Sequence, residues 1–140
     1  MSLSAFMAQN AAQAENQKLV VSLRFRDETG NPIPFEIRAL SEDEDAGLKK
    51  ICTTRTISKG RQITSFDNQR YMNLLVASSV VYPDLKDAEL QKSYGVVSDG
   101  DLLKKMLIPG EYLTLQQAVN EVNGFDTEKA DEAKDEVKNS

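Results

Sequence analysis

The chain has 140 residues, and its 40% hydrophobic and 28% charged side chains are typical of a globular protein with one core rather than of a disordered chain. Its 22 acidic and 17 basic residues give a net charge of −5. We find no basic stripe that could neutralise phosphates, so this composition disfavours nucleic-acid binding. Histidine is absent, which removes the usual general base near neutral pH and the usual zinc ligand.

Neither a membrane span nor a secretion signal is found in the sequence. The longest apolar stretch, residues 74–82, is far shorter than the ~20 residues needed to cross a bilayer. No basic residue precedes Lys18 and no long apolar region follows the first methionine. The single cysteine, Cys52, cannot form an internal disulfide. We therefore expect the protein to stay in a reducing compartment, where it is made.

The N-terminal segment has apolar and small side chains at helical spacing, in a stretch rich in alanine and glutamine. This pattern predicts a short amphipathic helix with a narrow apolar face. The residues on that face are Leu3, Phe6, Met7, Asn10, Ala11 and Ala14.

A β-hairpin is predicted next. In residues 18–27 apolar and polar side chains alternate, as they do in a strand with one exposed face. Gly30 and Pro32 follow in a turn-forming segment, and residues 33–40 form the returning strand.

The rest of the chain shows helical patterns. Four pairs of residues have the spacing of helix N-caps: Ser41 with Glu44, Thr64 with Asp67, Ser98 with Asp101, and Thr114 with Gln117. They predict helices over residues 46–53, 66–81, 102–107 and 115–122, and we place the second at the centre of the core. A further short helix is expected from Asp84 to Tyr94, and Pro109 with Gly110 should separate the last two helices. The predicted fold is α+β, with an N-terminal helix and a β-hairpin followed by a mainly α-helical bundle.

The C-terminal residues form an acidic tail. Between residues 127 and 140 the only large apolar side chain is Val137, which cannot offset the entropy of ordering so many charged residues. We predict one domain over residues 1–126 and a flexible tail over residues 127–140. Removing the tail should change the melting temperature by less than about 5 °C, whereas a larger drop would show that it packs on the domain.

Each group of residues that could carry chemistry has an ordinary structural explanation. Asp43, Glu44 and Asp45 could begin a calcium loop, but an acidic first turn also complements the helix dipole. Asp99 and Asp101 could hold magnesium or serve as turn and cap residues. Cys52 near basic residues is best explained as a structural cysteine, and the basic Lys59, Arg61 and Arg70 as a solvated face. No glycine-rich phosphate loop is present. We predict no catalytic, metal or cofactor site.

The predicted N-terminal helix offers one candidate for partner binding. Leu3, Phe6 and Met7 could pack on the protein's own domain, or they could stay exposed and contact a partner. We take these three residues as the candidate partner contacts.

Three stretches together resemble a known family. They are TGNPIPFEIRA (29–39), NQRYMNLLVASSVVYPDLKDAELQ (68–91), and a C-terminal group formed by YGVV (94–97), LLKKML (102–107) and GEY (110–112). They resemble the XkdN-like tail assembly chaperones of tailed bacteriophages and prophages. The likeness runs from about residue 3 to residue 126, and the acidic tail has no counterpart.

The resemblance implies a non-enzymatic assembly factor of the bacterial host cytoplasm. Such a factor binds the tape measure protein and keeps it soluble while tail tube subunits polymerise around it. It leaves before the virion is finished. The partners implied are the tape measure protein and the tail tube protein, without nucleic acid, membrane or cofactor, and self-association is left open.

Two alternatives remain at the level of sequence. The first is a structural tail component retained in the virion, which is disfavoured because a polymerising subunit should show more β structure than the one predicted hairpin. The second is an enzyme or regulator, which the missing histidine and missing basic surface disfavour.

Overall fold

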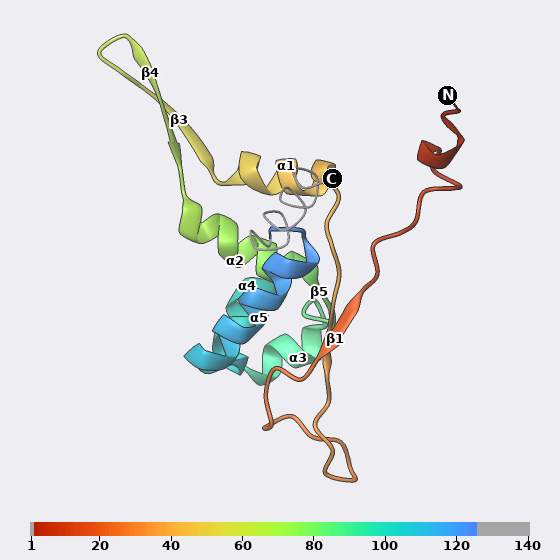
Figure 1. The fold of residues 1–140 in the computed structure, drawn as a ribbon. Coiled ribbons are helices and arrows are strands. Elements are labelled where there is room, and N and C mark those ends of the chain that lie inside the picture. Colours follow the sequence, from red (N-terminus) through yellow and green to blue (C-terminus); the bar gives the residue numbers. More distant parts are fainter. Residues whose placement is uncertain (1, 126–140) are drawn as a thin grey trace, which may run out of the picture.

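A computed structural model describes residues 2–125 of the chain, which form a mixed α/β fold (Figure 1). The predicted tail, residues 127–140, lies outside the described residues. Among the described residues no helix is long and apolar enough to span a membrane. The elements in chain order are η1 (Ser4–Phe6), β1 (Gln17–Leu19), β2 (Phe35–Ile37), α1 (Glu42–Ile51), β3 (Thr53–Ser58), β4 (Arg61–Phe66), α2 (Asn68–Ser79), β5 (Val80–Tyr82), α3 (Ala88–Ser93), α4 (Asp99–Met106) and α5 (Pro109–Val122).

The two segments predicted as a hairpin pair only over short strands, and a later strand joins them in a small antiparallel sheet. β1 pairs with β2 with Gln17 opposite Ile37, and β5 pairs with the other side of β2. The predicted strands are longer than the observed ones, since only a single bridge, between Arg26 and Pro32, continues the pairing toward the turn. β2 is the central strand, and its Phe35 and Ile37 are buried.

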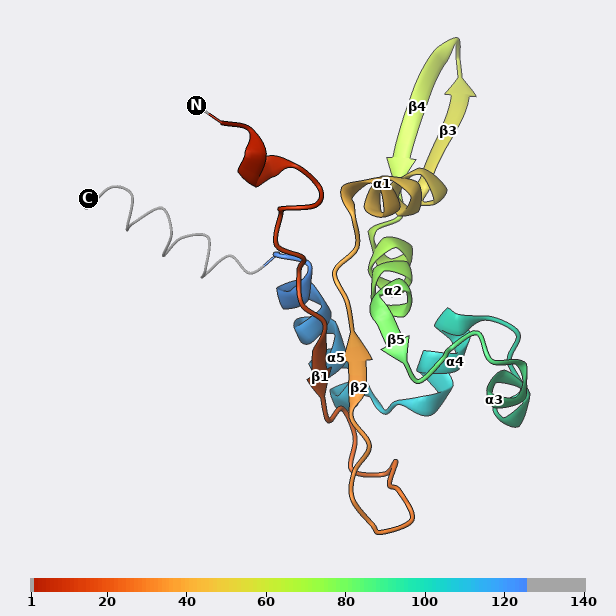
Figure 2. The same cartoon turned by 90° about the vertical axis from the view of Figure 1, so that its right-hand side faces the viewer.

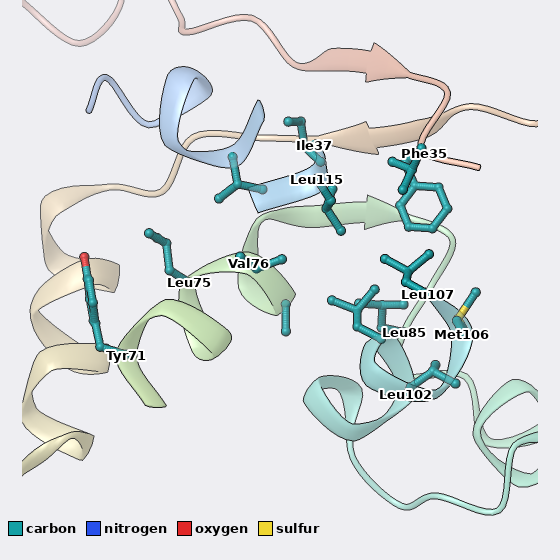
Figure 3. Close-up of a cluster of buried hydrophobic side chains, with 14 of the residues drawn as sticks. Phe35, Ile37, Tyr71, Leu75, Val76, Leu85, Leu102, Met106, Leu107 and Leu115 are labelled. Atoms are coloured by element: carbon teal, nitrogen blue, oxygen red, sulfur yellow. The ribbon is translucent and has the colours of Figure 1, made fainter. Parts of the chain in front are cut away.

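The core lies between this sheet and the helices α2, α4 and α5 (Figure 3). The prediction that the helix around residue 75 lies at the centre is confirmed, because five of the twelve α2 residues are buried. Helices α4 and α5 also supply buried leucines, which pack together with β2 because burying apolar surface is the main stabilising term in folding. The apolar side chains with least exposure are Ile37, Leu75, Val76, Leu102, Leu103, Leu115 and Val119.

The α2 prediction is wrong at both ends. The helix begins after Asp67, whose side chain accepts a hydrogen bond from the Arg70 amide at 3.0 Å. Thr64, the predicted cap, lies in β4 instead. At the other end the helix stops at Ser79, and the next three residues, Val-Val-Tyr, leave the helical path to pair with β2. β-Branched and aromatic side chains favour this extended conformation.

Two of the four predicted caps are confirmed. Ser41 and Glu44 form a complete capping box at the start of α1, and Ser98 accepts a hydrogen bond from the Asp101 amide at the start of α4. The cap predicted at Thr114 is wrong, because Thr114 lies inside α5 and its hydroxyl donates to the Gly110 carbonyl. The short helix α3 is capped by Asp87 rather than Asp84.

Pro109 begins α5 instead of separating two helices. Proline is tolerated at the first position of a helix, where its missing N–H has no intrahelical role. Glu111 accepts a hydrogen bond from the Ile108 amide at 3.0 Å, and it pairs with the Arg24 guanidinium. Arg24 also donates to the Met106 carbonyl at 2.7 Å. The Arg24 side chain therefore holds the loop after β1 against the junction of α4 and α5.

The Arg24–Glu111 ion pair predicts an acid-dependent contribution to stability. The hydrogen bond from Arg24 lowers the pKa of Glu111 from its ordinary value of 4.5 to about 2. Because the pKa is lower in the folded protein, the contribution is present above pH 4.5 and is lost as the pH falls toward 2. We expect Glu111→Gln to flatten the loss of stability in this window, as measured by urea unfolding at several pH values. Glu121→Gln, an exposed acid on the same helix, is the control, and an equal flattening in both variants would contradict the assignment.

Asn123 joins three elements at the end of α5. Its side-chain oxygen accepts from the Leu40 amide at 2.8 Å, and its amide group donates to the Ser79 hydroxyl at 3.1 Å and to the Val119 carbonyl at 2.9 Å. Ser79 is fully buried at the junction of α2 and β5. Asn123 therefore ties the end of α5 to α2 and to the segment that enters α1.

The predicted N-terminal helix is not formed. The segment contains only the single 3-10 turn of η1, which extends away from the body (Figures 1 and 2). The Asn10 side chain donates to the carbonyl and hydroxyl of Ser4, at 2.8 and 3.1 Å, and so stabilises a local turn. A helix this short is marginal in water unless its apolar face packs on something, and in this turn no residue is buried.

Candidate partner-binding surface

A second hairpin, formed by β3 and β4, projects from the body beyond α1 (Figures 1 and 2). We call it the arm, residues 53–66. Its register runs from Thr53 opposite Phe66 at the base to Ser58 opposite Arg61 at the tip. The sequence prediction missed the arm, since it placed residue 53 in a helix and Thr64 at a helix start.

The residues of the arm explain why it forms. Threonine and isoleucine recur along both strands, and β-branched side chains favour extended structure. Lys59 and Gly60 form a two-residue turn with φ of 53° and 76°. Positive φ at both positions is the geometry of the turn that best matches the twist of paired strands, and glycine adopts it without strain. A lysine-glycine pair between two β-branched runs was the signal that could have identified the arm.

The base of the arm is held firmly by its neighbours. The Cys52 carbonyl accepts from the Asp67 amide at 2.9 Å, and the Thr53 hydroxyl donates to the Lys49 carbonyl at 2.7 Å. The Phe66 ring lies 5.6 Å from the Tyr71 ring, centre to centre. Cys52 is buried between α1 and the arm, which agrees with its structural interpretation. The arm is therefore fixed in direction relative to α1 and α2.

A buried polar contact joins these two helices beneath the arm. The Tyr71 hydroxyl donates to the Asp45 carboxylate, and the Lys49 ammonium lies 3.0 Å from the same carboxylate. Burial, together with the Asp45 charge, raises the pKa of Tyr71. Burial works against ionisation of Asp45 as well, but the hydrogen bonds from Tyr71 and Lys49 outweigh it and lower the pKa of Asp45. Asp45 thus serves as a structural anion.

Basic side chains gather on and around the arm. Arg55, Lys59 and Arg61 belong to its strands and turn, and all three are exposed. At its base a hollow of about 550 Å³ is lined by Ala46, Lys49, Lys50, Thr53 and Arg55. The sequence analysis assigned Lys59 and Arg61 to a solvated face, and both side chains are exposed. It did not place them on a projecting hairpin, because the hairpin was not recognised.

Apolar side chains are exposed on both faces of the arm. Side chains alternate along a strand, and directly paired residues share a face. Ile57 therefore lies on the face that carries Arg55 and Phe66, and Ile63 lies on the opposite face with Arg61. Ile57 is 82% exposed, and Ile63 and Phe66 are about half exposed. Part of the apolar surface of the arm is therefore exposed.

The predicted contact residues Leu3, Phe6 and Met7 are exposed as well. Phe6 is 83% exposed, and none of the three is among the core residues or those packed against the core. The structure does not bring them to the arm, since the two segments lie apart in both views (Figures 1 and 2). Their role in binding stays a prediction.

The acidic residues considered as metal ligands have ordinary structural roles. Glu44 belongs to the α1 capping box and pairs with Arg38 at 2.6 Å. Asp99 and Asp101 occupy the first turn of α4. Within residues 2–125 no group of three or more cysteine, aspartate or glutamate side chains is placed to hold a metal ion.

Comparison with known proteins identifies the family. The family model of the phage XkdN-like tail assembly chaperone protein matches residues 3–138. This chain belongs to the XkdN-like tail assembly chaperone family. The match also extends through most of the acidic tail, so the expectation that the tail has no counterpart in the family is wrong.

Two proteins of Bacillus subtilis are similar to nearly the whole chain. The chain is 32% identical over 139 residues to the phage-like element PBSX protein XkdN of Bacillus subtilis strain 168, covering 98% of this chain and 93% of that protein. It is 33% identical over 131 residues to the uncharacterized protein YqbN of the same strain, covering 92% and 88%. The crystal structure of the protein YqbN superposes with a TM-score of 0.80 at 31% identity, covering 90% of this chain and 98% of that one.

Proposed function

We propose that this chaperone binds the tape measure protein of its phage, keeps it soluble in the host cytoplasm while the tail tube is built, and leaves before the virion is complete. Family membership carries the proposal. It is supported by the exposed apolar side chains on two projecting segments, among them Phe6 and Ile57, which the fold does not cover.

The physical requirement is reversible covering of apolar surface. A long helical protein made before its tube exists exposes apolar faces that promote aggregation. A partner that covers them must later be displaced by tube subunits, so each contact has to be of moderate strength. A few exposed apolar side chains on projecting segments suit this need better than a large apolar interface. The acidic body of the chaperone would help to keep the complex in solution.

The rival function, a tail subunit retained in the virion, can no longer be disfavoured by scarcity of β structure. The described residues contain a three-stranded sheet and the arm, where the sequence predicted one hairpin. Family membership supports the assembly role over the structural one, because the family is described as one of tail assembly chaperones.

Co-expression tests the proposal. The tape measure protein should be insoluble when expressed alone and soluble when expressed with this chain, as measured by its share of the soluble fraction. Purified virions should lack the chaperone. Stoichiometric amounts in virions would identify a structural component, and a tape measure protein that stays insoluble with the chaperone would contradict binding.

The N-terminal contact gives a second expected result. Phe6→Asp places a charge on the exposed N-terminal turn and should lower the soluble yield of the tape measure protein severalfold, because an apolar contact is lost. Folding should be unchanged, since Phe6 is largely exposed and lies outside the core. The control is Val97→Asp, which changes a 91% exposed side chain in the turn between α3 and α4. Equal effects of the two variants would remove the N-terminal turn from the binding surface.

A further inference from the structure

The arm contributes little to the stability of the body. Every residue of its two strands is exposed, apart from the partly buried Thr53 at the base. A two-stranded hairpin without packing is marginally stable in water, and its outer edges present unpaired backbone groups. In the described structure β3 and β4 pair only with each other, so both edges are open to a further strand. The arm is therefore better explained as a binding element than as an element that stabilises the fold.

The charge of the arm is opposite to that of the rest of the chain. The arm, residues 53–66, contains three basic residues and no acidic residue, a net charge of +3. The whole chain has 17 basic and 22 acidic residues, so the remainder has 14 and 22, a net charge of −8. A positive projection on a negative protein favours an acidic partner and holds it away from the body.

One face of the arm combines this charge with apolar surface. Ile57, Arg55 and Phe66 share that face, and Arg55 and Thr53 also line the hollow in which Lys49 and Lys50 lie. The face therefore continues into the basic hollow. A segment along it would meet an apolar side chain near the tip and cations toward the base, while its backbone could pair with an outer edge of the hairpin.

We propose that the arm and the basic hollow at its base form a docking site for an acidic, extended segment of the chaperone's protein partner, which joins the hairpin as an additional strand. The inference rests on the proposed function for the identity of that partner. A nucleic acid fits less well, because its phosphates would be repelled by the body and the only aromatic side chain of the arm is Phe66, at the base.

A peptide probe tests the docking site directly on the full chain. The probe is a fluorescent twelve-residue peptide of alternating glutamate and valine, and a peptide with lysine in place of glutamate is its control. We expect the acidic peptide alone to bind, with affinity that falls as salt is added. Binding should also protect outward-facing amides along one edge, at residues 55 and 57 or at residues 62 and 64, in hydrogen exchange. Binding without such protection would overturn the added strand.

Matched variants test which basic side chains bind the acidic peptide. Arg55→Gln, Lys59→Gln and Arg61→Gln together should weaken acidic-peptide binding by about tenfold or more, given the usual size of exposed charge contacts. The control triple Lys92→Gln, Lys104→Gln and Lys105→Gln removes the same charge from exposed positions on α3 and α4 and should change binding less than about twofold. Melting curves should match, since all six side chains are exposed. Equal weakening in both triples would overturn the site.

Three further outcomes separate this inference from the proposed function. If the wild-type chain solubilises the tape measure protein and the arm triple does so equally well, the docking site is wrong and the function stands. If the wild-type chain fails to solubilise it, the proposed function is wrong. Tighter binding of a single-stranded oligonucleotide than of the acidic peptide, or loss of self-association in the arm triple without loss of peptide binding, would assign the arm to nucleic acid or to a second copy and overturn the proposal.

Discussion

Leu115→Ala is expected to lower the free energy of unfolding by about 2–5 kcal/mol, the range for truncating a fully buried leucine. Leu115 has 0% exposure and lies on α5 in the same core as α2 and β2. Its removal would forfeit the transfer free energy of the side chain and leave a cavity that the surrounding helices can only partly fill. Urea unfolding, with the midpoint and slope both fitted, measures the change.

The matched control lies two residues away on the same helix. Leu113 is 53% exposed, so Leu113→Ala should change the free energy of unfolding by less than about 0.5 kcal/mol. Comparable losses in the two variants would show that α5 does not pack with the observed face toward the core.

Asn123→Ala should lower the free energy of unfolding by about 2–4 kcal/mol, which is a large effect for a polar side chain. The substitution removes three hydrogen bonds and leaves the buried Ser79 hydroxyl and the Leu40 amide without the partners they have in the native protein. Asn123→Asp keeps the acceptor for Leu40 but loses both donated bonds, so it should fall between the wild type and the alanine variant. Thermal and urea unfolding measure both variants.

The control for this residue is Asn120→Ala, about one turn earlier on α5, because the Asn120 side chain makes no hydrogen bond within residues 2–125. It should change the stability by less than about 0.5 kcal/mol. If Asn123→Ala were equally mild, water would have to replace the lost contacts, and the connection from α5 to α2 would not be a major source of stability.

The parts of the fold that could be predicted from sequence depend on local signals. The capping box at Ser41 and the cap at Ser98 are read from neighbouring residues, and both are confirmed. The helix around Leu75 has apolar residues at three- and four-residue spacing, and it is the central helix of the core. The turn at Gly30 was likewise predicted from neighbouring residues. The structure confirms it, because Gly30 has a φ of 87°, which glycine adopts without strain.

The parts that could not be predicted depend on partners distant in sequence. Residues 80–82 continue the helical spacing of α2, but pairing with β2 takes them into an extended strand. Residues 3–14 have the spacing of a helix, but all of them are exposed in the described structure and only a turn forms. Most of the arm, residues 54–63, was assigned to no element, and only its base was placed at helix ends, because periodicity alone does not identify strands over so few residues.

The candidate site was predicted only in part. Leu3, Phe6 and Met7 were predicted as partner contacts on a helical stripe; the structure shows them exposed, and their role in binding stays a prediction. The arm was missed because its surface is created by pairing: residues 53 and 66 are neighbours only once the hairpin forms. The same pairing places Arg55 beside Lys49 and Lys50 around one hollow, which no short window of sequence displays.

The separation of charge between the arm and the body also gives the molecule a large electric dipole moment. In the field of a charged partner such a dipole experiences a torque, so the chaperone would turn its arm toward an acidic surface before the two proteins touch. Orientation during approach acts on the association rate, whereas the apolar contacts act on the lifetime of the complex. Rapid capture and ready release can therefore be adjusted by different residues of the same small protein.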